Sequence, residues 1–529
     1  MTQTNTRSDR LLLEEEIWGF RLYEEPAMIT LLEFLFATCR GGLLNSSSDW
    51  QHMPEITGPS HLLLRTLIFN NPMLEISNDW DDWEEFFQDK VISKSPLLKD
   101  WTSKELKSTF KSFENFRNVI NLIQASTVND GKKNRKWTNR FLFPWDQEQV
   151  FPDVKEVKHD DSNLTLARNF FGHTGEIAYL LLRLADNKED LQNLIDLRFK
   201  GCRHTMAKVC KCLEGNWASK AIIQASGAYL PKDCIDDKKT KLRANRLCDD
   251  LISLLELNLT TEDMVDPMSR IIGIHLACYQ IERAQHLAID PRLKGNNRPF
   301  FLCEAMQKQS SAIRRESKAS WQHNGKLCRQ VLLETFKTRF TRVESISQEE
   351  KFWACLEEFI PGAKTFRTES HEEEIQRGNF SNLKSEIQEA LEKKFDRHSG
   401  IFHKTITVSI GLTTSQNTNS FRYAPSDEFL FALALANVRD KHMPFRDFLD
   451  LLYEKYGLVF DEKCEEKARP RLKPGQECSV ARIETKDLQD NADRLLNQMM
   501  SLGLLRHLSD GCDYVTNPYF KVKSEKNVR

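Results

Sequence analysis

The segment Arg168–Glu176 places a histidine and a glutamate on a glycine-containing turn. Its sequence is RNFFGHTGE, and helical periodicity begins near its last residue. His173 and Glu176 are residue types that transfer protons, and a helix N-terminus also attracts anions. They are therefore our candidates for acid–base catalysis. The alternative is a simple helix entry, in which Thr174 caps the helix and Glu176 interacts with its dipole, because no nucleophile or second carboxylate follows at a fixed spacing.

A second candidate consists of residue types that bind zinc. The pattern C-x-H-x5-C-x-C is formed by Cys202, His204, Cys210 and Cys212. Helical residues two apart point about 200° away from each other, so Cys210 and Cys212 can share one ion only if the helix breaks between them. We favour the alternative of buried free thiols, and we expect no metal or other cofactor.

Short basic stretches form a third kind of candidate, for nucleic acid. The first surrounds Trp137 and contains Lys132, Lys133, Arg135, Lys136 and Arg140. The second opens a predicted helix and contains Lys238, Lys239, Lys241, Arg243 and Arg246. The third contains Lys308, Arg314, Arg315 and Lys318. Cations beside an aromatic ring can hold phosphates and stack on a base. For the first stretch, the alternative is a solvated loop that balances the acidic residues 79–85.

The motifs of several well-known enzyme classes are absent from the sequence. It contains no P-loop G-x-x-x-x-G-K-[ST], no G-x-G-x-x-G, no H-E-x-x-H and no G-x-S-x-G. Pro152–Asp153 and Glu156-x-Lys158 imitate a nuclease PD…ExK set, but only two residues separate the two parts, which in such nucleases lie on different strands. We therefore expect a binding protein rather than an enzyme.

Composition limits the class and the compartment. The 529 residues include 75 Lys+Arg and 77 Asp+Glu, so the net charge is 75 − 77 = −2. Such a chain is not a wholly basic nucleic-acid-coating protein, although local patches can still bind phosphate. Thirteen cysteines, an odd number in a long chain, are typical of reduced thiols. With a polar first ten residues and no apolar run of about 20, the sequence predicts a soluble cytoplasmic protein without a membrane partner.

Helical periodicity dominates the first 425 residues. Within Lys104–Ser126 apolar residues recur at three- and four-residue steps, and Met268–Ile289 shows the same pattern. The one clear strand-like run is Thr405–Leu412, in which apolar and polar residues alternate from Ile406 to Ile410. The fold class that follows is mainly α.

The last hundred residues give the clearest local signals. Three helices and a hairpin are expected there: Asp427–Val438 capped by Ser426, Pro444–Tyr456 ended by Gly457, Lys486–Leu502 ended by Gly503, and a hairpin with the turn Asp510–Gly511.

This order of elements, over about Ser426–Phe520, resembles a winged-helix domain, a variant of the helix-turn-helix, although the charged insertion Glu462–Arg482 departs from the usual form. In DNA-binding members the last helix enters the major groove. Here that helix, residues 486–503, has two cations and three aspartates, a charge of 2 − 3 = −1, which phosphates repel. Its residues that can contact bases are Asn491, Asn497 and Gln498. We favour the alternative, a winged helix used for protein contacts or domain packing.

The expected organisation is a multidomain helical protein with a C-terminal winged-helix-like α+β module. The segments are an N-terminal helical domain at 1–130, a basic linker or loop at 131–160, a central helical domain at 161–365, a linker with a short strand at 366–425 and the winged-helix-like domain at 426–529.

This architecture resembles accessory subunits of multigene DNA-targeting systems. We predict a non-enzymatic nucleic-acid-binding or adaptor subunit of a multiprotein bacterial system acting on DNA, of the kind used in antiphage defence. Its partners would be DNA or another nucleic acid and other protein subunits. One alternative is a protein-interaction scaffold that docks through its winged helix. Another is a metal-dependent enzyme built on His173 and Glu176 or on the Cys202–Cys212 set.

Overall fold

The computed structural model describes residues 11–508 and 512–520 apart from short gaps. The gaps are 20–25, 46–50, 55, 58–61, 70, 72, 95–97, 99–100, 127–145, 147–153, 157–163, 167–172, 202, 216–221, 225–227, 291–297, 306–310, 417–419, 441 and 469–482.

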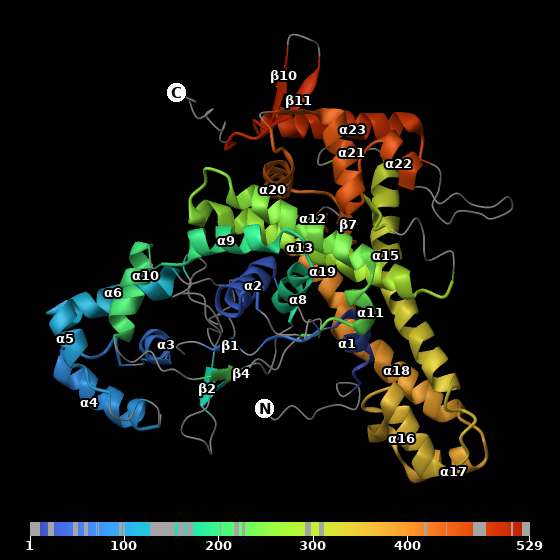
Figure 1. The fold of residues 1–529 in the computed structure, drawn as a ribbon, viewed down its shortest axis with the longest axis horizontal. Helices are drawn as coiled ribbons and strands as arrows, with labels where there is room; N and C mark the ends of the chain where they lie inside the picture. The colour runs from blue at the N-terminus through green and yellow to red at the C-terminus, as the bar shows by residue number, and fades with distance from the viewer. Residues whose placement is uncertain are drawn as a thin grey trace.

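Helix α13 (Thr261–Leu287) lies at the centre of the fold (Figure 1). The Thr260 hydroxyl accepts a hydrogen bond of 3.2 Å from the backbone N–H of Asp263 and so caps its start. Side chains are buried on all sides of α13, which is expected only of a helix in the protein interior. The helices that pack around it are α2 (Ala27–Gly41), α8 (Thr174–Arg183), α12 (Lys238–Leu255), α15 (Ser311–Thr341), α19 (Ser399–Ser409) and α20 (Asp427–Asn437).

Smaller helices extend the fold in two directions. On the side drawn in blue and cyan in Figure 1 lie α3 (Leu62–Phe69), α4 (Trp80–Lys90), α5 (Lys104–Phe110), α6 (Phe113–Ser126) and α10 (Thr205–Glu214). At the far end of α15 lie α16 (Glu349–Phe359), α17 (Glu369–Gln376) and α18 (Ser381–Arg397). The remaining helices before the C-terminal region are α1 (Leu13–Trp18), α9 (Lys188–Phe199), α11 (Lys232–Ile235) and the 3₁₀ turns η2 (Ile92–Lys94) and η3 (Ala363–Phe366).

The sheets are small. A four-stranded sheet has the order β1 (Ile56–Thr57), β4 (Ile222–Gln224), β3 (Leu164–Leu166) and β2 (Val154–Glu156), with β3 and β4 parallel. Two further pairs are β5 (Phe301–Leu302) with β9 (Leu458–Val459), which are parallel, and β6 (Thr413–Thr414) with β7 (Arg422–Tyr423), which are antiparallel. With so little strand, the mainly α prediction is confirmed. In the described part of the chain, no helix has both the length and the apolar character that crossing a bilayer requires.

The C-terminal module has the helices and the hairpin that the sequence predicted. In chain order it consists of α20, β8 (His442–Pro444), α21 (Phe445–Tyr456), β9, α22 (Glu462–Ala468), α23 (Thr485–Ser501), β10 (Leu505–His507) and β11 (Asp513–Thr516). Strand β11 pairs with both β10 and β8, so that Val515 faces Leu505 on one side and Met443 on the other. Ser426 caps α20 as predicted, and Gly457, at φ +78°, ends α21.

The strand predicted at Thr405–Leu412 is wrong. These residues continue helix α19 as far as Ser409, and only Thr413–Thr414 form a strand. The apolar residues Phe402, Ile406 and Ile410 are four apart and fully buried, whereas Val408 is 42% exposed. A four-residue repeat is the pattern of a helix, but these residues also fit a two-residue repeat because Val408 lies between two of them. The segment 366–425, predicted as a linker, contains the helices α17, α18 and α19.

A buried polar network links the central helices to the C-terminal module. Asp250 of α12 is fully buried; its Oδ2 lies 2.8 Å from His275 Nε2 of α13 and accepts a 2.6 Å hydrogen bond from the Tyr456 hydroxyl of α21. Lys455 pairs with the other carboxylate oxygen. Burial alone would raise the pKa of Asp250, but Lys455 and His275 outweigh it and lower the pKa.

Two buried histidines predict a loss of stability in mild acid. Burial lowers the pKa of His275 from 6.5 to about 4, against the opposing effect of Asp250, and it lowers the pKa of His403 to about 4 as well. The unfolded chain therefore binds these protons at a higher pH than the folded chain does. The free energy of unfolding should fall as the pH drops from about 6.5 to about 4, by up to about 3 kcal/mol for each histidine.

Urea titrations at half-unit pH steps measure this effect. In His403→Gln, the slope of unfolding free energy against pH should be shallower by about 1.4 kcal/mol per pH unit near pH 5. The reason is that the variant lacks one side chain that takes up a proton when the protein unfolds. A slope identical to that of the unmodified protein would contradict the lowered pKa of His403.

Candidate functional site

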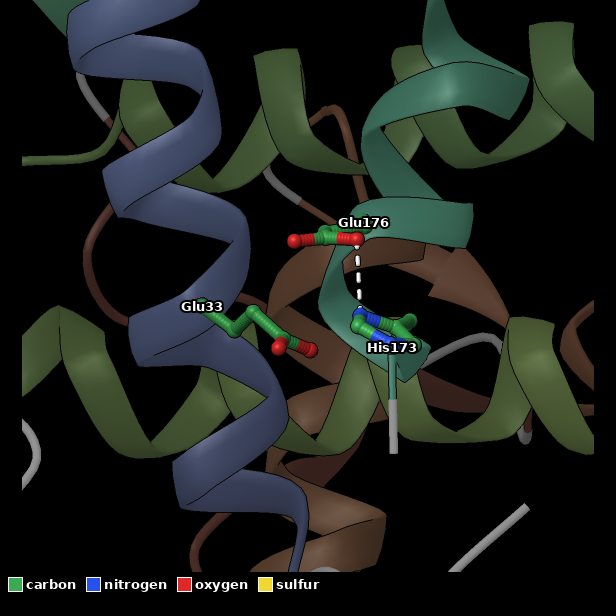
Figure 2. A group of neighbouring side chains, drawn as sticks. All are labelled: Glu33, His173 and Glu176. Atoms are coloured by element: carbon green, nitrogen blue, oxygen red, sulfur yellow. Dashed lines mark ion pairs between the residues drawn. The ribbon is translucent and has the colours of Figure 1, made fainter. Parts of the chain in front are cut away.

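Glu33, His173 and Glu176 come together where helices α2 and α8 meet (Figure 2). Each offers one ligand-type atom, and the three atoms lie within 4.8 Å of one another. Glu33 is 5% exposed and Glu176 is 1% exposed, while the side chain of His173 is 18% exposed. The sequence-predicted pair His173 and Glu176 is therefore joined by a second carboxylate that the sequence did not reveal.

Gly175 makes this meeting of helices possible. A Cβ atom at this position would lie 2.4 Å from the carbonyl oxygen of Thr30 and 2.6 Å from the backbone nitrogen of Phe34, both in α2. Because real Cβ atoms do not approach backbone atoms so closely, any larger residue would push α8 away from α2. The Thr174 and Thr30 hydroxyls, 3.0 Å apart, bond across the same contact. Thr174 is the first residue of α8 and not its cap, which corrects the helix-entry alternative, because His173 occupies the N-cap position.

Backbone donors orient both carboxylates. The N–H of Gly175 donates to Glu33 Oε2 at 2.9 Å, and the N–H of Ala228 donates to Glu176 Oε2 at 2.8 Å. His173 Nδ1 lies 2.9 Å from the same oxygen of Glu176. The three side chains thus have defined directions, and they form a compact acid–base or metal-ligand group.

The cysteine set is not assembled by the described residues. Helix α10 runs unbroken through Cys210 and Cys212, so Cys210 is buried and Cys212 is exposed on the opposite face. His204 caps α10 through its side chain and lies 2.7 Å from Glu262. Cys202 lies outside the described residues. Among the described side chains, the group of metal-ligand type is the one formed by Glu33, His173 and Glu176.

The second predicted basic cluster divides between surface and core. Lys238, Lys239 and Lys241 are exposed at the start of α12, and Lys241 pairs with Asp186 at 2.7 Å. Arg243 is 1% exposed and donates to Glu282 at 3.0 Å. Because its guanidinium faces the interior, Arg243 does not belong to a phosphate-binding surface in this structure. The sequence showed that Arg243 is charged, but it did not show on which side of α12 the residue lies.

The first basic cluster stays a prediction. Its residues Lys132, Lys133, Arg135, Lys136, Trp137 and Arg140 lie outside the described part of the chain.

Two residues of the third basic cluster, Arg315 and Lys318, begin a longer basic face on α15, whereas Arg314 pairs with the buried Glu304 at 3.1 Å and Lys308 lies outside the described residues. This helix has seven Lys+Arg and two Glu, so its charge is 7 − 2 = +5 over 31 residues. Five cations at steps of 3, 8, 3 and 8 share one face: Arg315, Lys318, Lys326, Arg329 and Lys337. An 11-residue repeat equals 3.67 residues per turn, which keeps its members aligned along a helix. Arg315 and Lys318 belong to the third basic cluster predicted from the sequence, and the 11-residue spacing in the sequence also indicates the other three.

The face is open to solvent. Lys326 and Lys337 are exposed, Lys318 is half-buried, and the side chains of Arg315 and Arg329 are 65% and 42% exposed. We term these five residues the α15 basic face. Arg329 pairs with Asp396, and Arg315 lies 2.9 Å from the buried Glu316. Within the described residues, no carboxylate lies within ion-pair distance of its three lysines.

Helix α23 turns two of its three candidate base-contacting side chains inward. Asn491 is 3% exposed; its Nδ2 donates to the carbonyl oxygens of Cys303 and Phe460 at 3.0 and 2.9 Å, and its Oδ1 accepts from the N–H of Ala305 at 2.9 Å. Gln498 donates to Asp427 at 2.7 Å. Only Asn497 of the three is exposed.

Comparisons of the chain with protein-family models, with curated proteins and with solved structures find no match.

The close approach of α2 to Gly175 predicts that two glycine substitutions change the free energy of unfolding in opposite directions. Gly175→Ala should lower the free energy of unfolding by about 1–3 kcal/mol, because the added methyl group overlaps the backbone of α2. Gly325→Ala is the matched control within helix α15, where nothing lies within 4 Å of the new atom, and it should stabilise the protein by up to about 1 kcal/mol. Chemical denaturation of both variants measures the difference, and equal effects would contradict the packing described here.

The two asparagines of α23 should also behave differently. Asn491→Ala leaves three buried backbone groups without their partner and should cost about 3 kcal/mol or more of stability. Asn497→Ala, on the exposed side of the same helix, should change stability by less than about 0.5 kcal/mol. Thermal and urea unfolding of the two variants check this, and an Asn491 variant as stable as the Asn497 variant would refute the structural role.

Proposed function

We propose that this protein is a DNA-binding subunit that holds the phosphate backbone of duplex DNA along the α15 basic face. The observation that carries the proposal is five aligned cations on a solvent-facing helix side that has no acidic residue of α15 among them. Cationic side chains in a row are the electrostatic footprint of a phosphate-binding surface, even in a protein whose net charge is close to zero.

The dimensions of the face suit a duplex. From Arg315 to Lys337 there are 22 helical steps, or about 33 Å at 1.5 Å per residue. One turn of B-DNA is about 34 Å long. The five cations can therefore contact phosphates spread over one turn of DNA without bending it. Contacts of this kind fix position and supply affinity, but they do not read sequence.

A cation and two aromatic rings lie next to this face. Trp321, three residues after Lys318, has its ring centroid 5.3 Å from that of Phe421. The exposed Lys404 of α19 places Nζ 4.7 Å from the centre of the Phe421 ring. The cation–π contact holds Lys404 in place beside α15, where it adds a sixth positive charge.

The C-terminal module favours a second role in protein contacts. We infer that it is a winged-helix domain, since its helices α20, α21 and α23, followed by the hairpin β10–β11, and the pairing of β8 with β11 support that resemblance, with β9 and α22 inserted between α21 and α23. Its α23 uses Asn491 and Gln498 internally, and the helix carries more acidic than basic residues. These features argue against base reading by α23 and favour docking onto another protein.

Location and assembly remain sequence-based proposals. Most of the described cysteines are buried, and several of them, such as Cys234, Cys248 and Cys278, are free thiols, which supports a reducing cytoplasm. Additional phosphate contacts by Lys238, Lys239 and Lys241 and by the stretch Lys132–Arg140 stay predictions, as does membership of a bacterial antiphage assembly.

A triple substitution tests the α15 basic face. Replacing Lys318, Lys326 and Lys337 by Ala removes three charges that have no carboxylate partner among the described residues. Affinity for a short duplex in about 0.1 M salt should fall roughly 100-fold, because three fewer counterions are released from the DNA. Fluorescence anisotropy with a labelled duplex measures the affinity.

The matched control removes three exposed lysines from the other side of the molecule. The variant Lys90, Lys104 and Lys211→Ala has the same change in net charge but should bind DNA within about twofold of the unmodified protein, because distant surface charges are largely screened. Equal loss in both triple variants would mean that overall charge, and not the α15 basic face, determines binding. Undiminished binding in the α15 variant would refute the proposal.

A further inference from the structure

The cluster of Glu33, His173 and Glu176 combines one imidazole nitrogen with two carboxylate oxygens in a largely buried space (Figure 2). Glu33 comes from the middle of α2, His173 from the residue before α8, and Glu176 from its first turn. Side chains from elements 140 residues apart in the chain therefore point toward one place. The DNA-binding proposal uses none of these residues.

The separations suit direct coordination of one ion. In a tetrahedral site with bonds of about 2.1 Å, the ligand atoms lie about 3.4 Å apart. All three candidate atoms lie within 4.8 Å of one another, which is close to the spacing that ligands of one ion require.

The surroundings of the cluster hold the ligands in position. The Gly175 and Ala228 N–H groups each bond to one oxygen of a carboxylate and so orient the carboxylate. The contact between His173 Nδ1 and Glu176 restrains the imidazole ring. Such outer hydrogen bonds are typical partners of metal ligands.

The electrostatic balance favours a cation. The N-terminus of α8 carries about half a positive charge, which repels cations, whereas the two carboxylates contribute two full negative charges when ionised. Of these two contributions, that of the carboxylates is the larger.

We propose that Glu33, His173 and Glu176 bind one divalent transition-metal ion, with its remaining coordination positions filled by water. A mixed nitrogen and oxygen ligand set suits Zn²⁺ best and Mn²⁺ less well, whereas Mg²⁺ prefers an all-oxygen octahedral shell. The expected order of affinity is Zn²⁺, then Mn²⁺, then Mg²⁺. With three protein ligands, the site has the composition of an open metal centre and not of a closed structural one.

Calorimetric titration of the chelator-treated full-length protein with Zn²⁺ alone tests this site. The unmodified protein should bind one ion through this cluster, and His173→Gln and Glu33→Gln should each weaken binding at least tenfold. Glu33→Gln keeps an acceptor for the Gly175 N–H, and His173 is partly exposed, so both substitutions preserve the fold around the site. Circular dichroism of each metal-free variant checks the fold.

His204→Gln is the matched control. His204 is also a helix-capping histidine paired with a glutamate, but it has no third ligand of metal-binding type near it among the described residues, and it belongs to the Cys202–Cys212 pattern. Its substitution should leave the affinity unchanged. Loss of binding in His204→Gln with retention in His173→Gln and Glu33→Gln would assign the metal to the cysteine pattern and overturn the proposal.

Thermal unfolding gives an independent reading. An ion that binds only the folded state raises the midpoint of the unmodified protein, and the shift should shrink in His173→Gln. No binding by the unmodified protein, or equal affinity in all variants, would refute the site.

Discussion

The buried charge of Asp250, at the junction of three helices, is the constraint that joins the central helices to the C-terminal module. Removing a carboxylate from water costs several kcal/mol unless its partners are well placed, and loss of one partner leaves the others buried and unpaired. Asp250 on α12 is bonded to His275 on α13 and to Lys455 and Tyr456 at the end of α21. Arg243 extends the network by donating to the carbonyl oxygen of Lys455. The C-terminal module is therefore fixed to the central helices, and one hydrophobic core includes residues from Leu11 to Val515.

Both proposed sites depend on this rigid arrangement. Helix α15 packs against α13, α18 and α19 among other elements, and Arg315, Lys326 and Lys337 of the α15 basic face are exposed to solvent. The metal-ligand cluster lies where α2 and α8 pack against each other and against α13. A row of phosphates or a small ion is held well only when its ligands are fixed in advance, and here helices and not loops carry almost all of the ligands. Within the C-terminal module, the inward hydrogen bonds of Asn491 also fix α23 in place. Because of these bonds, Asn491 is not available to contact DNA bases.

Local signals predicted local structure, and tertiary contacts account for what the sequence did not show. The cap at Ser426, the stop at Gly457 and the hairpin after Gly503 depend on neighbouring residues, and they are where the sequence placed them. At Thr405–Leu412 the sequence pattern fitted both two- and four-residue periods, and burial of Ile406 and Ile410 against Gly273 of α13 selected the helix. Glu33 could not be linked to His173 from the sequence, because their proximity depends on the packing of α8 on α2 through Gly175. The α15 basic face could have been predicted, since its 11-residue repeat is visible in the sequence alone.

The central claim is that the protein binds DNA through a row of cations that contact phosphate and not bases. Its most direct test is the salt dependence of binding by the unmodified protein to two duplexes of equal length and unrelated sequence. If three to five cations of the face contact phosphates, the slope of log Kobs against log salt concentration should lie between about −3 and −4.5, with the same affinity for both duplexes. A slope near zero, or an affinity that differs strongly between the two duplexes, would contradict the claim.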